Sequence, residues 1–227
     1  ARKFLPTELV VHHARFPDGI AQFLLGLVPV RIGAEPLFGP QRELDRESEA
    51  EVLVDFFGEL AEGAYFLDHL RFFEERCGPY PFRHEKYGIV ETPHLGMEHQ
   101  TIIAYGNRYR KVSFDYDWLH HHELAHEWWG NLVTCRDWKD MWIHEGIGTY
   151  MQALYIEERH GAKAYRVEMA TKRRSIANRR PIAPREPTDS VAIYFGTDGA
   201  GGVSDSDIYF KGSWVCHTLR YLVGDEA

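Results

Sequence analysis

Two histidines four residues apart, His122 and His126, are the side chains whose spacing points most directly to chemistry. On an α-helix, positions four apart lie one above the other on a single face, so both imidazoles can reach one metal ion. Glu123 can point at a water on that metal without being a ligand itself. Neither His120 nor His121 has a histidine four residues further on, so only one register works. The pattern predicts metal-assisted hydrolysis, provided that the segment is helical.

The third metal ligand must come from elsewhere in the chain, because a catalytic zinc site normally takes three protein ligands and leaves a fourth position open. Positions 127 to 135 contain no histidine, so a third histidine shortly after His126 is excluded. Glu145 lies on the next predicted helix, and an antiparallel return would bring it back beside the metal. We therefore expect one Zn²⁺ per chain, bound by His122, His126 and Glu145.

Two longer motifs surround these residues, His-Glu-Leu-Ala-His-Glu-Trp-Trp-Gly-Asn-Leu-Val-Thr at 122–134 and Trp-Ile-His-Glu-Gly at 142–146. Their wording and spacing resemble the gluzincin zinc aminopeptidases, the family of leucyl, alanyl and puromycin-sensitive aminopeptidases and leukotriene hydrolase. The resemblance covers about residues 80–223. It implies an enzyme that hydrolyses the N-terminal peptide bond of peptides by attack of a zinc-activated water, with Glu123 as the general base.

The resemblance also implies roles for residues outside the two motifs. Gly96-Met97-Glu98 resembles the family's exopeptidase signature, in which Glu98 would hold the free α-amine of the substrate. Tyr209, in Tyr-Phe-Lys-Gly, resembles the catalytic tyrosine, whose hydroxyl would donate a hydrogen bond to the oxyanion of the tetrahedral intermediate. The expected partners are therefore peptide substrates with a free N-terminus.

Two positions depart from the family's usual Gly-x-Met-Glu-Asn. Leu95 stands at the first glycine and His99 replaces the asparagine, whereas Glu98 is retained. These departures keep open an endopeptidase or a broader hydrolase with the same chemistry. A third hypothesis, from a different class of protein, is a non-catalytic domain in which zinc is structural and the groove only binds peptide.

The elements that must position these residues follow from the hydrophobic periodicity. Strands and turns are expected before residue 110, and helices dominate after it, so the fold class is α+β. We expect short strands within the first forty residues, a helix from about 46 to 77, strands at Tyr87–Val90 and Met97–Tyr105, the metal-binding helix from Asp117 to Gly130, and helices at 139–160, 162–180 and from Asp207 onward.

The sequence also predicts how some of these helices pack and whether the cysteines are buried. Gly146 and Gly148 are poor helix formers, and we expect them to let another backbone approach closely. The last helix should carry Ile208, Val215, Leu219 and Leu222 inward. Cys77, Cys135 and Cys216 form neither a disulfide framework nor a zinc-ribbon pattern, and we expect buried thiols.

For the whole chain, the resemblance implies a thermolysin-like domain, a mixed β-sheet lobe packed on a mainly helical lobe. We expect a single domain over 1–227, β-rich to about 110 and helical from about 111. We expect the family's N-terminal β-domain and C-terminal helical domain to lie outside this sequence, and we expect a catalytic domain that contacts them in a longer enzyme.

Composition excludes other classes of protein. The chain has 227 residues, of which 44% are hydrophobic, enough for a packed core. Its net charge of −8 disfavours a nucleic-acid partner, which usually needs a basic patch. Because no run of eighteen apolar residues occurs, we expect no membrane span. We expect a soluble protein and favour the cytoplasm over export.

Overall fold

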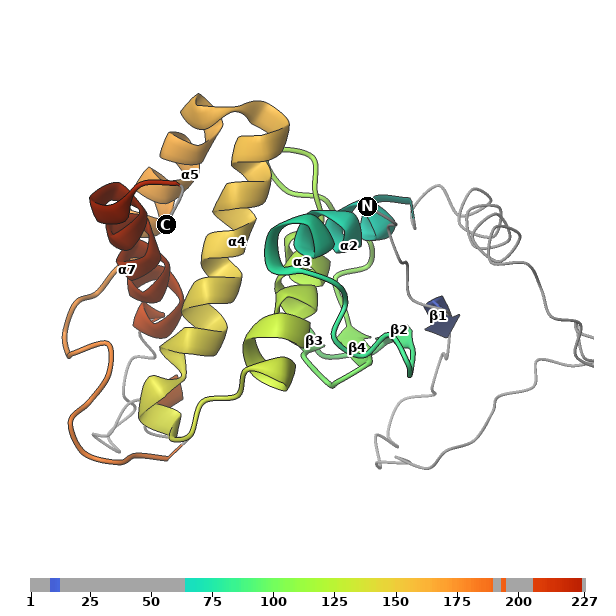
Figure 1. The fold of residues 1–227 in the computed structure, drawn as a ribbon, viewed down its shortest axis with the longest axis horizontal. Helices are drawn as coiled ribbons and strands as arrows, with labels where there is room; N and C mark the ends of the chain where they lie inside the picture. The colour runs from blue at the N-terminus through green and yellow to red at the C-terminus, as the bar shows by residue number, and fades with distance from the viewer. Residues whose placement is uncertain (1–8, 13–63, 190–192, 195–205, 226–227) are drawn as a thin grey trace, which may run out of the picture.

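A computed structural model describes residues 9–12, 64–189, 193–194 and 206–225 of the chain. Helices and one small sheet occupy separate regions of the described part, as the α+β prediction requires (Figure 1). In chain order the elements are β1 (Leu9–His12), α2 (Ala64–Cys77), β2 (Tyr87–Glu91), β3 (Gly96–Met97), β4 (Ile102–Tyr105), α3 (Trp118–Ala125), the π-helical turn η1 (Glu127–Leu132), the 3₁₀ turn η2 (Trp138–Asp140), α4 (Trp142–His160), α5 (Ala162–Arg174) and α7 (Asp207–Val223).

The sheet has the strand order β1-β2-β4-β3. Strands β1, β2 and β4 run parallel to one another, and β3 is antiparallel to β4. The predicted strand at Tyr87–Val90 is confirmed, whereas a single strand over Met97–Tyr105 is wrong. The backbone turns between β3 and β4, where Thr101 has φ +63° and the Ile102 N–H donates to the His99 carbonyl at 3.0 Å.

Helix α3 contacts β3, β4, α2 and α4, with the sheet on one side and α4 on the other (Figure 1). It begins where predicted, because the Asp117 carboxylate accepts hydrogen bonds from the N–H groups of Leu119 and His120, both at 3.0 Å. Asn107 and Tyr105 donate to the same carboxylate. The start of α3 is therefore tied to β4.

The predicted end of α3 at Gly130 is wrong, because the α-helix stops at Ala125. From there the chain widens into η1, in which the Asn131 N–H donates to the His126 carbonyl at 2.8 Å. Trp129 has ψ 72° and Gly130 has φ +155°, neither of which is helical. The widened turn redirects the backbone carbonyls that follow His126.

Helices α4 and α7 meet at a glycine pair. A Cβ built on Gly146 would lie 2.7 Å from the Gly212 Cα, so the close approach predicted at Gly146 is confirmed. At Gly148 it is wrong, since a Cβ there would make only ordinary contacts of 3.5 Å or more. Helix α4 ends as predicted before Gly161, which has φ +82°.

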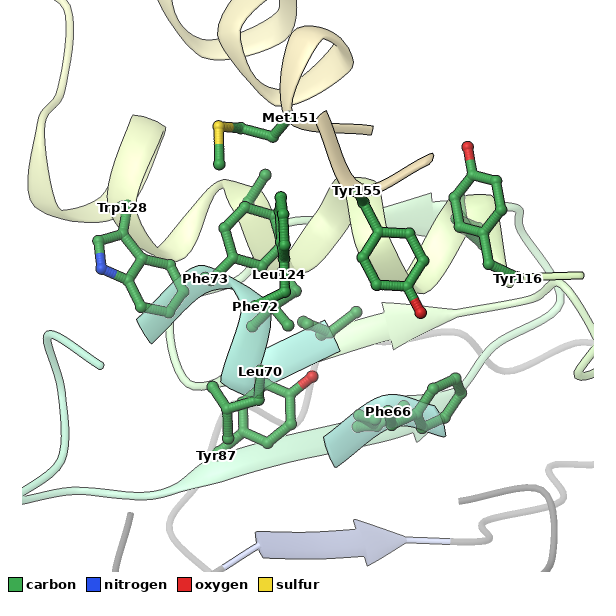
Figure 2. Close-up of a cluster of buried hydrophobic side chains, with 14 of the residues drawn as sticks. Phe66, Leu70, Phe72, Phe73, Tyr87, Tyr116, Leu124, Trp128, Met151 and Tyr155 are labelled. Atoms are coloured by element: carbon green, nitrogen blue, oxygen red, sulfur yellow. The ribbon is translucent and has the colours of Figure 1, made fainter. Parts of the chain in front are cut away.

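The main core forms where the aromatic face of α2 packs on α3 and α4 (Figure 2). Phe73 stacks on Trp128 with ring centroids 5.3 Å apart, and Leu124 of α3 is fully buried beside them. Full burial of such a side chain contributes about 1.5–3 kcal/mol. This core holds α3 rigidly against its neighbours.

The predictions for α5, α7 and the cysteines are only partly confirmed. Helix α5 ends at Arg174, earlier than predicted, and α7 begins at Asp207 as predicted. Ile208 is buried, but Leu219 and Leu222 were wrongly expected inward, since they are 52% and 71% exposed. The three cysteines are free and only half-buried, so the expectation of buried thiols is wrong.

Two expectations lie partly outside the described residues. The helix predicted from about 46 is described only over α2, and of the strands predicted in the first forty residues only β1 is described. Within the described ranges, no helix has both the length and the apolar content of a membrane-spanning segment.

Candidate active site

His122, His126 and Glu145 converge between α3 and α4. The Nε2 atoms of the two histidines are 3.2 Å apart, and Glu145 Oε2 lies 3.0 Å from His122 Nε2 and 3.4 Å from His126 Nε2. Tetrahedral zinc with bonds of about 2.0–2.1 Å separates its ligand atoms by about 3.3 Å. All three side chains are buried. The donor atoms therefore fit one zinc-sized ion.

The electrostatics of this cluster favour a positive charge at its centre. Burial would raise the pKa of Glu145, but the two histidines hold it well below its usual value. Burial likewise opposes protonation of His126, yet the Glu145 carboxylate raises that pKa to about 10. Because the carboxylate stays ionised, a cation between the three side chains is compensated.

The orientation of the His126 ring is set by the widened turn η1. His126 Nδ1 lies 3.1 Å from the Trp129 carbonyl oxygen, which can only accept a hydrogen bond. Nδ1 therefore carries a proton in either protonation state of the ring, and Nε2, whose proton faces the Glu145 carboxylate, is the nitrogen that a metal would take in place of that proton. The non-helical ψ of Trp129 is what turns this carbonyl toward the ring.

Glu123 occupies space that Gly96 leaves open. A Cβ built on Gly96 would lie 2.6 Å from Glu123 Oε1 and 2.8 Å from Leu119 Cδ1. Burial raises the pKa of the Glu123 carboxyl to about 8, against the opposing effect of His126. Any side chain at position 96 would displace the carboxylate that the sequence assigns as general base.

Glu98 follows β3 and faces the same space from the sheet side. Its carboxylate, that of Glu123 and a ring nitrogen of His126 have ligand atoms within 4.8 Å of one another. Asn131 Nδ2 donates to the Glu98 carbonyl at 3.1 Å, which ties the strand end to η1. His99, at the family's asparagine position, is exposed.

A cavity of about 260 Å³ unites the predicted residues. Its wall comprises Gly96, Met97, Glu98, His122, Glu123, His126, Trp138, Met141, Glu145, Tyr194 and Tyr209. Every residue predicted for metal binding, catalysis or substrate binding is therefore brought together. Trp138, Met141 and Tyr194 are additional, and no motif in the sequence singles them out.

Two tyrosines from the C-terminal part of the chain, Tyr194 and Tyr209, face Glu145. Tyr209 lies in the first turn of α7, with its ring centroid 5.8 Å from that of His122. The Tyr194 hydroxyl donates to Glu145 Oε1 at 2.8 Å. Burial and the nearby Glu145 carboxylate raise the pKa of both hydroxyls, so both can donate hydrogen bonds at neutral pH.

The neighbouring histidines make other contacts. His120 Nδ1 lies 2.8 Å from His69 Nδ1, and its Nε2 contacts the Tyr87 hydroxyl. His144 Nε2 accepts from the Cys135 N–H at 2.8 Å. These rings are engaged away from the cavity, in keeping with the register inferred from the sequence.

A buried histidine pair and a buried carboxylate facing one cavity are the arrangement of a metallopeptidase site, and the comparisons with known proteins identify the family. The sequence model described as the peptidase family M1 domain matches residues 69–227. The chain belongs to peptidase family M1.

Relatives of known activity share this region. The chain is 34% identical over 112 residues to aminopeptidase N of Lactococcus lactis subsp. lactis, an alignment covering 47% of this chain and 13% of the relative. It is 31% identical over 113 residues to human endoplasmic reticulum aminopeptidase 2, covering 46% and 11%. The chain thus spans a quarter or less of these curated relatives.

Among solved structures, the M1 zinc metallopeptidase of Deinococcus radiodurans is similar in fold. The form solved as an E323A mutant with a Tyr-Ser-Ala substrate matches with a TM-score of 0.54 and 28% identity. The match covers 70% of this chain and 33% of that one. Both comparisons concern a piece of longer proteins.

Proposed function

We propose that this chain carries the catalytic site of a zinc aminopeptidase, which removes the first residue from peptides with a free N-terminus. The observation that supports this most is the meeting of three metal-binding donors, a buried Glu123 and Glu98 in one cavity of about 260 Å³. Membership of peptidase family M1 supports the same reaction class.

His122, His126 and Glu145 would hold one zinc ion, since their donor atoms have the separations that a tetrahedral site needs. When bound, zinc supplies a Lewis acid that activates water and polarises a carbonyl. His122 lies in α3, His126 directly follows this helix and Glu145 lies in α4; both helices pack on the core, so the site is preorganised.

Glu123 would act as the general base. Its carboxylate accepts a proton from the attacking water and later donates it to the leaving amine. Burial raises the pKa of this carboxyl to about 8, which brings it near the neutral range in which a general acid–base group works best. Gly96 keeps the space that this side chain needs.

Tyr209 and Glu98 would bind two different groups of the substrate, the carbonyl oxygen and the α-ammonium. The Tyr209 hydroxyl would donate a hydrogen bond to the carbonyl oxygen as it becomes negative, a contribution typically worth about a hundredfold in rate. The Glu98 carboxylate would pair with the α-ammonium, with Met97 and Gly96 completing this wall. An internal peptide bond has no charge at that position, so Glu98 favours exopeptidase action.

At the level of architecture, we propose a thermolysin-like domain with a sheet-containing part to about residue 110 and a helical part from about 111. The helical content after α3 and the likeness to the Deinococcus enzyme support this division. Because relatives are much longer, we propose that it acts beside an N-terminal β-domain and a C-terminal helical domain.

Metal analysis of the purified protein combined with turnover tests the proposal. We expect one zinc per chain and hydrolysis of a free-amine aminoacyl anilide that stops on chelation and returns with added zinc. A stoichiometry far below one, or turnover unaffected by chelation, would rule out the zinc-dependent reaction.

A further inference from the structure

The two oxygens of the Glu145 carboxylate have different partners. Oε2 faces the ring nitrogens of His122 and His126 at 3.0 and 3.4 Å. Oε1 points the other way and accepts the hydrogen bond from the Tyr194 hydroxyl at 2.8 Å. One carboxylate oxygen therefore faces the two histidines, and the other accepts a hydrogen bond from a tyrosine.

Tyr194 is itself held by contacts that do not involve the metal cluster. The preceding residue, Ile193, is buried in a hydrophobic cluster with Met141 and Ile208. The Ile193 carbonyl accepts from Arg180 Nη2 at 2.9 Å. The Tyr194 ring lies edge-on to Trp138. The hydroxyl is therefore positioned from outside the ligand set.

A carboxylate can bind a metal through one oxygen or through both, and a free carboxylate can rotate between these modes. A hydroxyl that donates to Oε1 keeps that oxygen away from the metal and fixes the plane of the group. Hydrogen-bonded partners of ligands typically tune metal affinity by about 10- to 100-fold.

We propose that Tyr194 is a positioning residue for the metal, which holds Glu145 as a one-oxygen ligand through its hydrogen bond to Oε1. The inference rests on the proposed function, because it assumes that Glu145 is a ligand. It assigns Tyr194 a role different from that of Tyr209, the other tyrosine in the cavity wall.

The test is the zinc affinity of Tyr194→Phe, measured by competition with a chelator of known affinity. Loss of the hydroxyl should raise the zinc Kd by about 10- to 100-fold. Tyr209→Phe should lower turnover, because its hydroxyl is proposed to donate to the oxyanion. Tyr150→Phe is the matched control, because its hydroxyl pairs with that of Tyr165 in α5 and it does not line the cavity, so its removal should change neither quantity.

A Kd for Tyr194→Phe within fivefold of the wild-type value would overturn the proposal. If that variant does not fold, as judged by thermal melting, Arg180→Gln tests the same anchor through Ile193, with the same threshold. A wild-type protein that binds no zinc would instead contradict the proposed function. The two failures are therefore distinguishable.

Discussion

Glu123 and Glu98 are two carboxylates in one cavity, and their different surroundings suit the different tasks that we propose for them. Glu123 is buried beside Gly96, in a space that no other residue type at position 96 would leave open. Glu98 is half-buried at the end of β3, where a substrate ammonium can reach it. Burial suits a proton acceptor, and partial exposure suits a binding group that must meet a charged ligand from water.

Replacing Glu123 by Gln should separate metal binding from catalysis. The amide keeps the shape of the side chain but cannot accept the proton, so we expect a loss of turnover of about 10²–10⁴-fold or more. Zinc content should stay at one per chain, because Glu123 is not among the three convergent donors. Metal analysis and anilide hydrolysis on the same preparation check both; unchanged turnover would exclude Glu123 as the base.

At the scale of elements, the packing of α4 on α7 fixes the relation between Glu145 and Tyr209. The contact depends on Gly146 and Gly212, whose backbones leave no room for a Cβ. Tyr209 lies one turn before Gly212 on α7, and Glu145 immediately precedes Gly146 on α4. The glycine contact therefore brings Glu145 and Tyr209 to one cavity wall.

Two glycine-to-alanine variants test this contact. Gly146→Ala forces a Cβ against the Gly212 backbone, which typically costs about 1–3 kcal/mol, whereas Gly148→Ala meets only ordinary contacts and gains about 0.5–1 kcal/mol in a helix. Thermal melting should therefore show a lower Tm for the first and an equal or higher Tm for the second. Equal melting of both variants would contradict the close packing.

The turn between β3 and β4 is joined to η1 by polar contacts. Glu127 Oε1 accepts from the Thr101 N–H at 2.8 Å, and Asn131 donates to the Glu98 carbonyl. Asn131→Ala removes a bond worth about 1 kcal/mol, so KM for a free-amine substrate should rise about fivefold with a smaller change in kcat. Leu132→Ala, an exposed neighbour, is the control; an unchanged KM for Asn131→Ala would show that this bond does not position Glu98.

The site residues that belong to local sequence patterns could be predicted from the sequence. His122 and His126 share a helix face, and Glu145 sits in a motif at fixed spacing, so all three could be predicted. The end of α3 could not, because η1 depends on a contact between the Trp129 carbonyl and the His126 ring. Tyr194 contacts a residue 49 positions away and belongs to no motif. Leu219 and Leu222 show that a hydrophobic pattern gives a helix face but not what covers it.

For the whole molecule, zinc would join α3 to α4 and so stabilise the fold. With free zinc at about 100 times its Kd, binding contributes about 2.7 kcal/mol. For a chain of this size that corresponds to about 5–11 °C in Tm. Melting of the chelated and zinc-loaded protein checks this, and an unchanged Tm would contradict binding between two helices of the core.

We propose that the cavity acts on the first residue of a peptide, and a pair of anilide substrates that differ only at the amine tests this. Zinc-loaded protein is given a free-amine aminoacyl anilide and the same compound with an acetylated amine. We predict that the free amine is hydrolysed and that acetylation abolishes turnover, because Glu98 then loses its charged partner. Equal turnover of both compounds would contradict an aminopeptidase and indicate a peptidase that does not read the N-terminus.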